Sequence, residues 1–378
     1  MNVGIVSWWF NRGQATVGRH IRSALAELGH ETFVLARPTP DRFLLSRFVD
    51  HRDVWDQPGV TPASRFKIPA SEYERWVRDH AIEAVFFDQN YQFAEIARLR
   101  SAGVRTIGRF VWEQFGAEHV AGAKEALDVV YSLTRAEQTR YRDEFDLQTP
   151  YVSWGVHPEL IAAAAPRHSD ALYFFYPGGH LSDRKPTRSV VEAFRAVDDA
   201  GIRLVLKTQR PLKPFHVNAD ARRPLTRRGR ARPEPEPRLR AAIADDRIIV
   251  DTADVSLAEY HRTFSACHVC LAPSRWEGLG LHFFEALAFG MPIITNDAPP
   301  MNELVIDGDT GLLVASRACG HTPSGLEASE PSVEGMRDAI STLADRAVME
   351  RMAAGSERMR AERSWARTVA GLGALLDA

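Results

Sequence analysis

The chain has 378 residues, 45% of them hydrophobic and 25% charged, which is the composition of an ordinary soluble globular protein. This length exceeds what a single hydrophobic core usually supports, so we expect two domains. The net charge of −2 argues against a surface built throughout for nucleic acid, and no apolar run reaches the roughly 18 residues of a membrane-spanning helix. Because the chain opens directly as a strand, without a secretory leader, we expect a cytoplasmic protein.

The first part of the chain alternates short apolar runs with amphipathic runs, a pattern typical of a parallel α/β sheet. We expect it to form an N-terminal Rossmann-like domain over residues 1–155. The expected strands are residues 2–8, 31–38, 84–87, 105–111, 128–132 and 150–154, and the expected helices are residues 16–30, 70–80, 91–101, 116–127 and 135–145.

After a connector rich in proline and alanine, the alternation restarts and predicts a second Rossmann-like domain over residues 170–355. Residues 210–240 lack hydrophobic periodicity and predict an inserted mobile loop, and residues 320–331 predict a second loop. We expect residues 356–378 to form a C-terminal helix that packs back toward the first domain. The expected strands are residues 171–176, 203–207, 247–250, 268–272, one that starts at 293, and 311–314; the expected helices are residues 187–198, 257–267, 281–289, 333–345 and 347–363.

The most informative stretch is residues 271–314, whose helix is apolar on nearly all sides and yet carries Glu285 at its centre. A buried carboxylate needs hydrogen-bond donors, and the hydroxyl groups of a ligand can provide them. Glu277 lies on the loop before this helix, where Gly278 and Gly280 let the backbone approach a ligand closely. The N–H groups at the helix start favour an anion such as a phosphate. Carboxylates for hydroxyls and a helix start for phosphate predict a nucleotide-sugar site.

The run PSRWEGLGLHFFEALAFGMPIITND, followed by Glu303 and the turn DGDTGLLV, resembles the signature of glycosyltransferase family 4. These are retaining, nucleotide-sugar-dependent enzymes. The likeness covers most of the chain and is sharpest over residues 171–314. It implies a GT-B fold, an α/β architecture of two Rossmann-like domains whose parallel sheets face a central cleft.

The resemblance also implies roles for the donor side. Glu277 would meet hydroxyls of the donor sugar, Glu285 the ribose hydroxyls, and the amides of Gly280 and Leu281 the sugar or the diphosphate. In the family, the motif GRLxxxKG supplies an arginine and a lysine to the diphosphate, and this chain reads GGHLSDRKP there. Lys185 matches the lysine, His180 stands in place of the arginine, and Arg184 or Lys207 would supply the missing charge. The predicted donor-binding residues are Glu285, Gly278, Leu279, Gly280, Leu281, His180, Arg184, Lys207 and Gly179, and the predicted catalytic residues are Glu277, Lys185 and Glu113.

The first domain departs from the family pattern. Glu113 follows the strand after which the family often has a histidine, so it is either an acceptor-facing group or a carboxylate at a helix N-terminus. The loop after the first strand contains only Gly13, and its aromatic residues Trp8, Trp9 and Phe10 either stack on a flat acceptor or enter the core. These four residues are the predicted acceptor-side residues.

The predicted reaction needs no cofactor and no metal. Asp307-Gly308-Asp309 could suggest a metal site, but Asp-Gly-Asp-Thr-Gly between two apolar strands is ordinary turn chemistry. Departure of the nucleoside diphosphate leaves an oxocarbenium-like sugar, which the acceptor attacks on the same face with retention of configuration. The predicted partners are a nucleotide sugar and an acceptor that is a glycan, a lipid, a natural product or another small molecule.

Two other functions stay open. One is a GT-B sugar-nucleotide enzyme that does not transfer, such as an epimerase or a hydrolase. The other is a polyanion or nucleic-acid binder that acts through the arginine-rich residues 222–240. This run lacks interleaved aromatic residues for base stacking, which favours a solvated linker over a nucleic-acid site, and peripheral contact with an anionic membrane is a further alternative.

Overall fold

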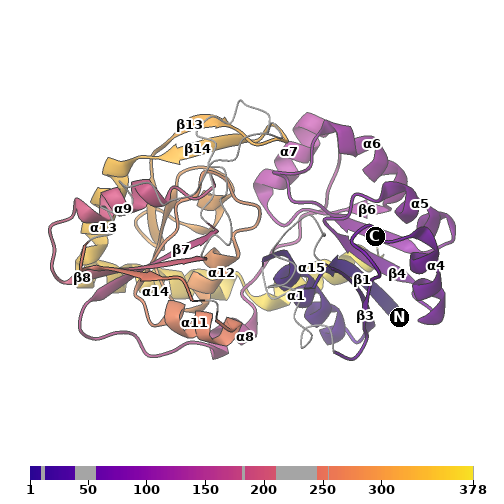
Figure 1. Ribbon diagram of the computed structural model, residues 1–378, viewed down its shortest axis with the longest axis horizontal. Helices are drawn as coiled ribbons and strands as arrows, with labels where there is room; N and C mark the ends of the chain where they lie inside the picture. Colours follow the sequence, from indigo (N-terminus) through magenta and orange to yellow (C-terminus); the bar gives the residue numbers. More distant parts are fainter. Residues whose placement is uncertain (10–12, 39–56, 181–183, 210–244, 254, 378) are drawn as a thin grey trace. The chain divides into compact units, whose positions relative to one another are not determined.

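The structure is a computed structural model that describes residues 1–9, 13–38, 57–180, 184–209, 245–253 and 255–377. Its chain forms two compact units, residues 1–155 with 365–378 and residues 156–364 (Figure 1). The predicted inserted loop, with its arginine-rich run, lies outside the described residues. Within the described residues, none of the helices combines the length and the apolar character that a membrane span requires.

The first unit is built on a six-stranded parallel sheet in the order β3-β2-β1-β4-β5-β6. Its two central strands are mostly apolar and buried, as is usual where helices cover a parallel sheet on both faces. The chain leaves β1 toward β2 and later returns on its other side as β4, so the strand order reverses between β1 and β4. The strands are β1 (Asn2–Trp8), β2 (Glu31–Arg37), β3 (Val60–Pro62), β4 (Ala84–Asp88), β5 (Arg105–Arg109) and β6 (Val129–Val130).

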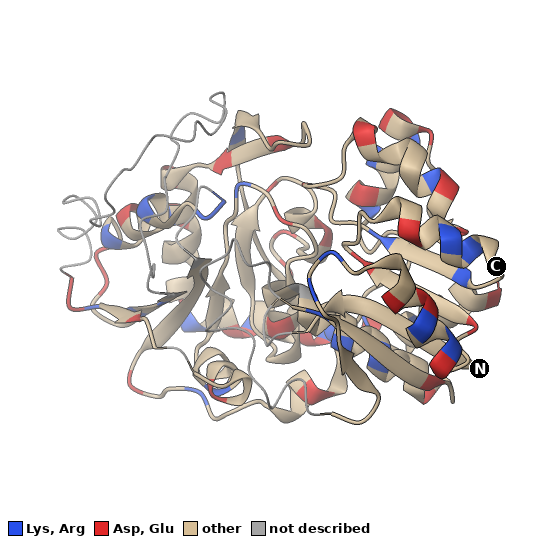
Figure 2. Cartoon of the chain, turned by 45° about the vertical axis from the view of Figure 1, so that its right-hand side comes forward, with Lys and Arg blue, Asp and Glu red and all other residues tan. Residues whose placement is uncertain are grey.

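The helices of the first unit follow the predicted amphipathic runs, and α7 (Arg135–Phe145) begins at a capping side chain. At the start of α7, Thr134 Oγ1 accepts a hydrogen bond from the Glu137 amide and Glu137 Oε2 accepts one from the Leu133 amide. Acidic and basic side chains are interspersed over the helices of this unit (Figure 2). The helices are α1 (Gly13–Glu27), α4 (Ala70–Asp79), α5 (Phe93–Ser101), α6 (Ala117–Ala126), α7 (Arg135–Phe145) and α15 (Trp365–Asp377).

Two predictions for the first unit are wrong. The helix expected over residues 16–30 instead spans Gly13–Glu27. Residues 150–154 form no strand and make one isolated bridge, between Ser132 and Tyr151. The last helix, α15, belongs to this unit, where the Arg105 guanidinium donates to the Leu375 carbonyl.

The second unit repeats the architecture with the strand order β12-β11-β10-β7-β8-β9, again entirely parallel. Its apolar core joins the sheet to the helices that cover it. The order reverses between β7 and β10, and ligands of open α/β sheets bind at the carboxyl ends of the strands at such a point. The strands are β7 (Leu172–His180), β8 (Ile202–Gln209), β9 (Ile248–Asp251), β10 (Val269–Leu271), β11 (Ile293–Asn296) and β12 (Gly311–Val314).

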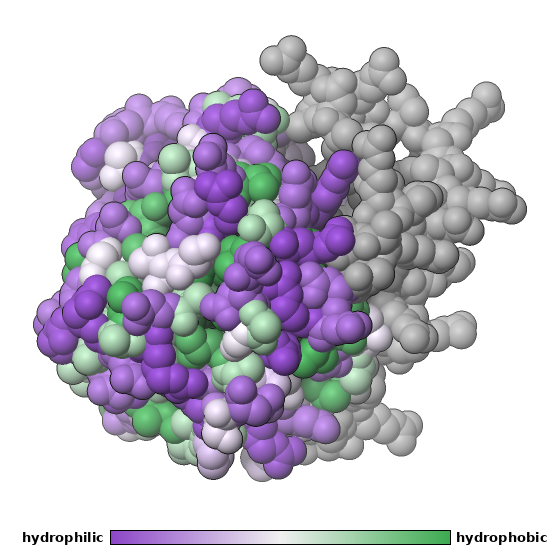
Figure 3. All heavy atoms as spheres, turned by 90° about the vertical axis from the view of Figure 1, so that its left-hand side faces the viewer, coloured by the Kyte–Doolittle hydropathy of each residue, from purple (hydrophilic) through white to green (hydrophobic). Residues whose placement is uncertain are grey.

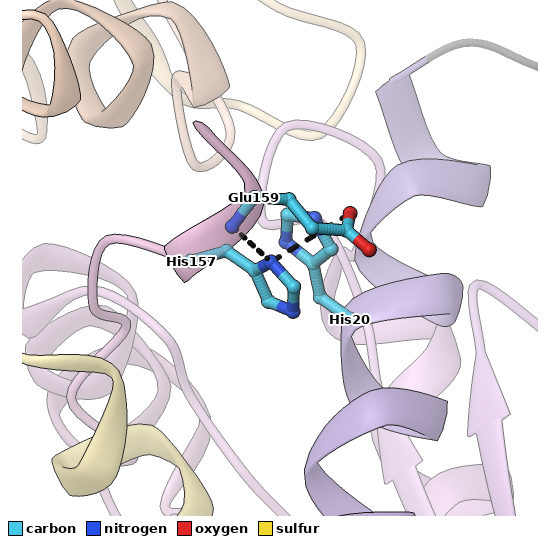
Figure 4. A group of neighbouring side chains, drawn as sticks. All are labelled: His20, His157 and Glu159. Atoms are coloured by element: carbon cyan, nitrogen blue, oxygen red, sulfur yellow. Dashed lines mark hydrogen bonds and ion pairs between the residues drawn. The ribbon is translucent and has the colours of Figure 1, made fainter. Parts of the chain in front are cut away.

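The helices of the second unit include a short one that the sequence reading missed. It is α8, and at its start His157 Nδ1 accepts a hydrogen bond from the Glu159 amide at 3.3 Å (Figure 4). Polar and apolar side chains are mixed on the visible face of this unit (Figure 3). The helices are α8 (Pro158–Ala162), α9 (Thr187–Arg195), α11 (Leu257–Ser265), α12 (Leu281–Ala288), the 3-10 turn η1 (Met301–Leu304), α13 (Val333–Ala344) and α14 (Arg346–Glu362).

Residues 320–331, expected as a loop, instead belong to an antiparallel hairpin of β13 (Ser316–His321) and β14 (Glu327–Pro331). Much of the hairpin is solvent-exposed, so its residues carry little of the apolar alternation that signals a strand. The predicted turn at residues 307–310 is confirmed: the Leu313 amide donates to the Asp307 carboxylate, and the Thr310 amide donates to the Ile306 carbonyl. The α/β class with two parallel sheets is confirmed as well.

Candidate functional site

The strongest candidate site lies at the carboxyl ends of β7 and β10, where the strand order of the second unit reverses. Arg184 and Lys185 come from the segment after β7, and Glu277 comes from the loop after β10. The topology therefore brings together residues that are 92 positions apart in the sequence. Lys185 and Glu277 were both predicted as catalytic residues, and the structure places them in contact.

The Glu277 carboxylate is buried, and among its hydrogen-bond donors are the side chains of Lys185, Ser274 and Arg184. Lys185 Nζ donates to its Oε1 at 2.6 Å, Ser274 Oγ donates to the same oxygen at 2.8 Å, and Arg184 Nη1 donates to Oε2 at 3.2 Å. Lys185 Nζ also donates to Ser274 Oγ at 2.7 Å. Two cations thus surround one carboxylate, which leaves this cluster with a net positive charge.

The charges of the cluster follow from its burial and its neighbours. Burial opposes ionisation of Glu277, but the adjacent Arg184 and Lys185 outweigh it and hold the pKa of this carboxyl well below its usual range. Burial lowers the pKa of Lys185, and the ion pair with Glu277 opposes that shift. Arg184 keeps 39% of its side chain exposed, so the cluster reaches solvent on the Arg184 side.

The loop that carries Glu277 is held by the hairpin that the sequence reading missed. The Ser274 amide donates to Asn296 Oδ1 at 3.0 Å, and Asn296 Nδ2 donates to the Ser329 carbonyl at 2.9 Å. The Ser329 amide in turn donates to the Arg275 carbonyl at 2.8 Å, and the Arg275 side chain forms an ion pair with Glu330. The hairpin therefore positions the loop from two sides.

Gly280 ends this loop and begins α12. Its φ of 70° lies in the left-handed region, and an added Cβ would come within 2.5 Å of the Phe283 ring, so only glycine fits without strain. Gly280 provides no side-chain oxygen to cap α12, and the first amides of a helix have no partner within it. Gly278, Leu279 and Leu281 surround this helix start, where those amides and the helix dipole favour an anion.

Glu285, the second predicted carboxylate, lies one helical turn further along α12. Its Oε2 accepts a hydrogen bond from the Tyr260 hydroxyl at 3.2 Å, and its Oε1 lies 3.5 Å from His261 Nε2. Burial and the nearby Glu285 charge raise the pKa of Tyr260, so this hydroxyl stays protonated as a donor. Glu285 was expected to need hydrogen-bond donors, and Tyr260 on α11 provides one.

Of the other residues predicted to bind the donor, only some lie near Glu277. Arg184, rather than Lys207, lies beside Glu277, because Lys207 Nζ is engaged by Asp251 at 2.7 Å and by the Ala253 carbonyl at 2.8 Å. Gly179 lies at the exposed end of β7 with a φ of 54°, and His180 is the last residue of that strand.

The acceptor-side predictions fall at the carboxyl end of the first sheet. Trp9 is fully buried, with the Arg19 guanidinium 4.9 Å from its ring centroid. Of the two alternatives for Trp9, the structure therefore favours a place in the core. Trp8 is partly exposed and meets Phe66 edge-on at 5.4 Å between ring centroids. Gly13 begins α1, and Phe10 lies outside the described residues.

Glu113 lies in a turn before α6, close to a buried polar cluster of the first unit. In this cluster Arg109 Nη1 donates to Asp88 Oδ1 at 2.9 Å, and both side chains are only 3% exposed. Asp88, Glu113 and Arg109 all influence the pKa of Tyr91, which burial raises. Sequence reasoning missed Asp88 and Arg109, although both are the last residues of their strands, a position that points to the ligand-binding edge of a sheet.

Sequence reasoning also missed His282, the second residue of α12. Its Nε2 is buried 4.0 Å from Glu277 Oε1 and finds no hydrogen-bond partner among the described residues. A histidine two residues after the glycine turn was an available signal, because the start of α12 was already predicted to face a ligand.

Residues 179–322 match the family model described as Glycosyl transferases group 1. This segment contains the clustered Lys185 and Glu277 as well as Glu285. The matched part of the second unit, residues 179–322, is therefore similar to the group 1 glycosyl transferases. The predicted resemblance is confirmed at the level of this group.

Individual proteins are also similar to parts of this chain. A stretch of 73 residues is 37% identical to the lipopolysaccharide core biosynthesis mannosyltransferase LpsB of Rhizobium meliloti (strain 1021), covering 19% of this chain and 20% of that protein. The chain thus aligns with only about a fifth of that relative's length.

Solved structures are similar over the whole chain. Sucrose-phosphate synthase from Thermosynechococcus elongatus has a TM-score of 0.70 at 17% identity, with 100% of this chain and 98% of that one covered. HepE from Anabaena in complex with UDP-glucose has a TM-score of 0.65 at 12% identity, with 100% and 99% covered. Such identities show the fold alone, and together with the two parallel six-stranded sheets they confirm the predicted GT-B class.

Proposed function

We propose that this protein is a retaining glycosyltransferase of the family 4 type, which transfers a sugar from a nucleoside-diphosphate donor to an acceptor. The observation that carries the proposal is the Glu277 cluster: a buried carboxylate held by Lys185 and Arg184, directly before the uncapped start of α12. A carboxylate for sugar hydroxyls and an excess of positive charge for a diphosphate are the two requirements of such a donor.

Each part of the donor has a group that suits it. Lys185 has three N–H donors, of which the described structure uses two, for Glu277 and Ser274. The third N–H, the partly exposed Arg184 guanidinium and the α12 amides are suited to bind the diphosphate oxygens. Glu285 is suited to accept hydrogen bonds from the ribose hydroxyls, with Tyr260 holding it in place.

Transfer would begin when the bond between the anomeric carbon and the phosphate oxygen breaks and its electron pair stays on the diphosphate. The acceptor hydroxyl oxygen attacks the oxocarbenium-like carbon on the same face, and its proton passes to a diphosphate oxygen. No separate base is needed. Catalysis then rests on stabilising the charge of the leaving diphosphate, which we assign to Lys185, Arg184 and the start of α12 without a metal ion.

The names of the relatives support a hexose donor without defining it. LpsB is named a mannosyltransferase, and HepE was solved with UDP-glucose. We therefore propose a hexosyl or related glycosyl donor. The proposed acceptor is a glycan, a lipid, a natural product or another small molecule.

A thermal-shift panel tests the proposal with UDP, GDP, ADP and a sugar nucleotide of each. A ligand present at a hundred times its dissociation constant should stabilise the protein by about 2.7 kcal/mol. Glu285→Gln should weaken binding of the preferred nucleotide about tenfold. The matched control is Glu334→Gln, which changes a carboxylate on the same unit whose side chain is 78% exposed.

The outcomes separate the candidate functions. If no nucleotide or sugar nucleotide of the panel stabilises the protein, the donor site as described is wrong. Release of nucleoside diphosphate without any acceptor, or formation of a sugar epimer, would replace transfer by hydrolysis or epimerisation. A product whose anomeric configuration is inverted would overturn the retaining mechanism.

A further inference from the structure

His282 lies at the edge of the candidate donor site, in the first turn of α12. Its side chain is 11% exposed, and its Nε2 faces Glu277 Oε1 at 4.0 Å, too far for a hydrogen bond. The Glu277 carboxylate already accepts from Lys185, Ser274 and Arg184. Among the described residues Nε2 therefore has no partner, and a buried nitrogen without a partner costs roughly 1–3 kcal/mol.

The imidazole is neutral in this place. Burial is the main cause, and with the charges of Lys185 and Arg184 it lowers the pKa of His282 to about 3, against the opposing effect of Glu277. A neutral imidazole offers one N–H donor and one acceptor rather than a charge. His282 thus differs in kind from Lys185 and Arg184, which surround the same carboxylate.

The geometry favours a hydroxyl group over a phosphate as the missing partner. Two atoms 4.0 Å apart can both lie within hydrogen-bond distance of one oxygen placed between them. A hydroxyl oxygen there can donate its proton to the carboxylate and accept from an N–H, because a hydroxyl is both donor and acceptor. A phosphate oxygen is only an acceptor and would be repelled by the carboxylate beside it.

We propose that His282 is a specificity-determining residue whose Nε2 binds a hydroxyl of the donor's sugar, next to Glu277. This inference rests on the proposed function, since it assigns a contact within the same donor site. It separates the sugar-reading pair, Glu277 and His282, from the diphosphate-binding groups Lys185, Arg184 and the α12 amides. Loss of His282 should therefore weaken binding of a sugar nucleotide but not of the nucleoside diphosphate alone.

Isothermal titration calorimetry on the full chain tests this separation with two probe pairs, UDP with UDP-glucose and GDP with GDP-mannose. For the pair that binds the wild type, His282→Phe should weaken the sugar nucleotide about tenfold, the size of one lost hydrogen bond, and leave the diphosphate within about twofold. His282→Asn, which keeps a polar side chain, should recover part of the loss. His168→Phe changes an exposed histidine of the same unit and is the matched control.

The results decide between the inference and its alternatives. An equal loss for diphosphate and sugar nucleotide would make His282 a structural or phosphate-binding residue, and unchanged binding of both would remove it from the site. A wild type that binds neither pair and no other nucleotide or sugar nucleotide of the thermal-shift panel would overturn the proposed function itself. Because the ring is neutral, the ratio of the sugar-nucleotide affinities of the wild type and His282→Asn should be flat between pH 6 and 9, and a change centred near pH 6.5 would contradict the assignment. If His282→Phe does not fold, His282→Asn and the pH series give the same decision.

Discussion

Each unit holds a buried ion pair at the carboxyl edge of its sheet, and the two pairs are built differently. In the second unit, Glu277 accepts hydrogen bonds from Lys185, Ser274 and Arg184, and the second of these two cations, Arg184, is partly exposed. In the first unit, Asp88 and Arg109 are enclosed, and neither Asp88 Oδ2 nor Arg109 Nε has a hydrogen-bond partner among the described atoms.

The pKa shifts express the same difference. The neighbouring cations hold the pKa of Glu277 low, whereas burial raises the pKa of Asp88 despite its pairing with Arg109. A carboxylate with surplus donors and positive charge is prepared for an anionic ligand. An enclosed ion pair costs desolvation, and removing one partner leaves the other charge buried without its hydrogen-bonded counter-ion, so such a substitution should lower the stability of the protein.

The largest effect should follow from breaking the enclosed pair. Asp88→Leu leaves Arg109 buried without the carboxylate to which it is hydrogen-bonded and should lower the free energy of unfolding by about 3–5 kcal/mol. Urea unfolding followed by tryptophan fluorescence measures this, since of the eight tryptophans only Trp276 lies within residues 156–364. The double variant Asp88→Leu/Arg109→Met removes both charges and should recover most of the loss. A single variant as stable as the wild type would show that the Asp88–Arg109 pair does not hold the first unit together.

The next effect concerns catalysis in the second unit. Lys185→Met should lower turnover by roughly 10²–10³-fold, the range for removing one preorganised charge-stabilising donor. It should destabilise the protein less than Asp88→Leu does, because Arg184 and Ser274 still contact Glu277. Lys124→Met, at a half-exposed lysine of the first unit, is the control.

Steady-state kinetics with the donor found in the binding panel gives the turnover, and urea unfolding gives the stability. Wild-type turnover of Lys185→Met would exclude Lys185 from the chemistry. A loss of stability as large as that of Asp88→Leu would show that the two ion pairs are equivalent after all.

Local sequence patterns explain why most of the fold was predictable. Buried parallel strands appear as apolar runs. Helices often begin after a recognisable capping residue, as α7 does after Thr134. The exposed hairpin of β13 and β14 was missed because strands without a buried face lose their alternation. Residues 150–154 look like a strand but make only an isolated bridge, since pairing depends on a neighbouring strand that the sequence does not show.

The candidate site was predictable where it is continuous in sequence and not where the fold assembles it. Glu277 and Glu285 belong to one motif, and Lys185 was assigned by resemblance. The contact between Lys185 and Glu277 joins segments 92 residues apart, and the unpartnered Nε2 of His282 depends on what surrounds it in space. The Asp88–Arg109 pair likewise requires that β4 and β5 lie side by side.

The smallest expected effect is a difference in acid sensitivity. Burial is the main cause that lowers the pKa of His282 to about 3 and that of His268 to about 4, from an unfolded value of 6.5. Below pH 6.5 the unfolded chain binds protons that the folded unit refuses, so stability is complete above pH 6.5 and falls as the pH drops toward these values. The low pKa of Glu277 adds to this only below its unfolded value of 4.5, so between pH 6.5 and 4.5 this loss of stability comes from the two histidines and not from Glu277.

Asp88, with its raised pKa, has the opposite sign: its contribution is present at low pH and is lost as the pH rises. We therefore expect acid to act on the second unit through its buried histidines and not on the first unit through Asp88. Between pH 6.5 and 5, His282→Asn should lose about 1–2 kcal/mol less unfolding free energy than the wild type, as measured by urea titrations at each pH. Parallel losses in the two proteins would mean that His282 is protonated in the folded unit, and the contrast between a neutral sugar-reading histidine and its charged neighbours would then disappear.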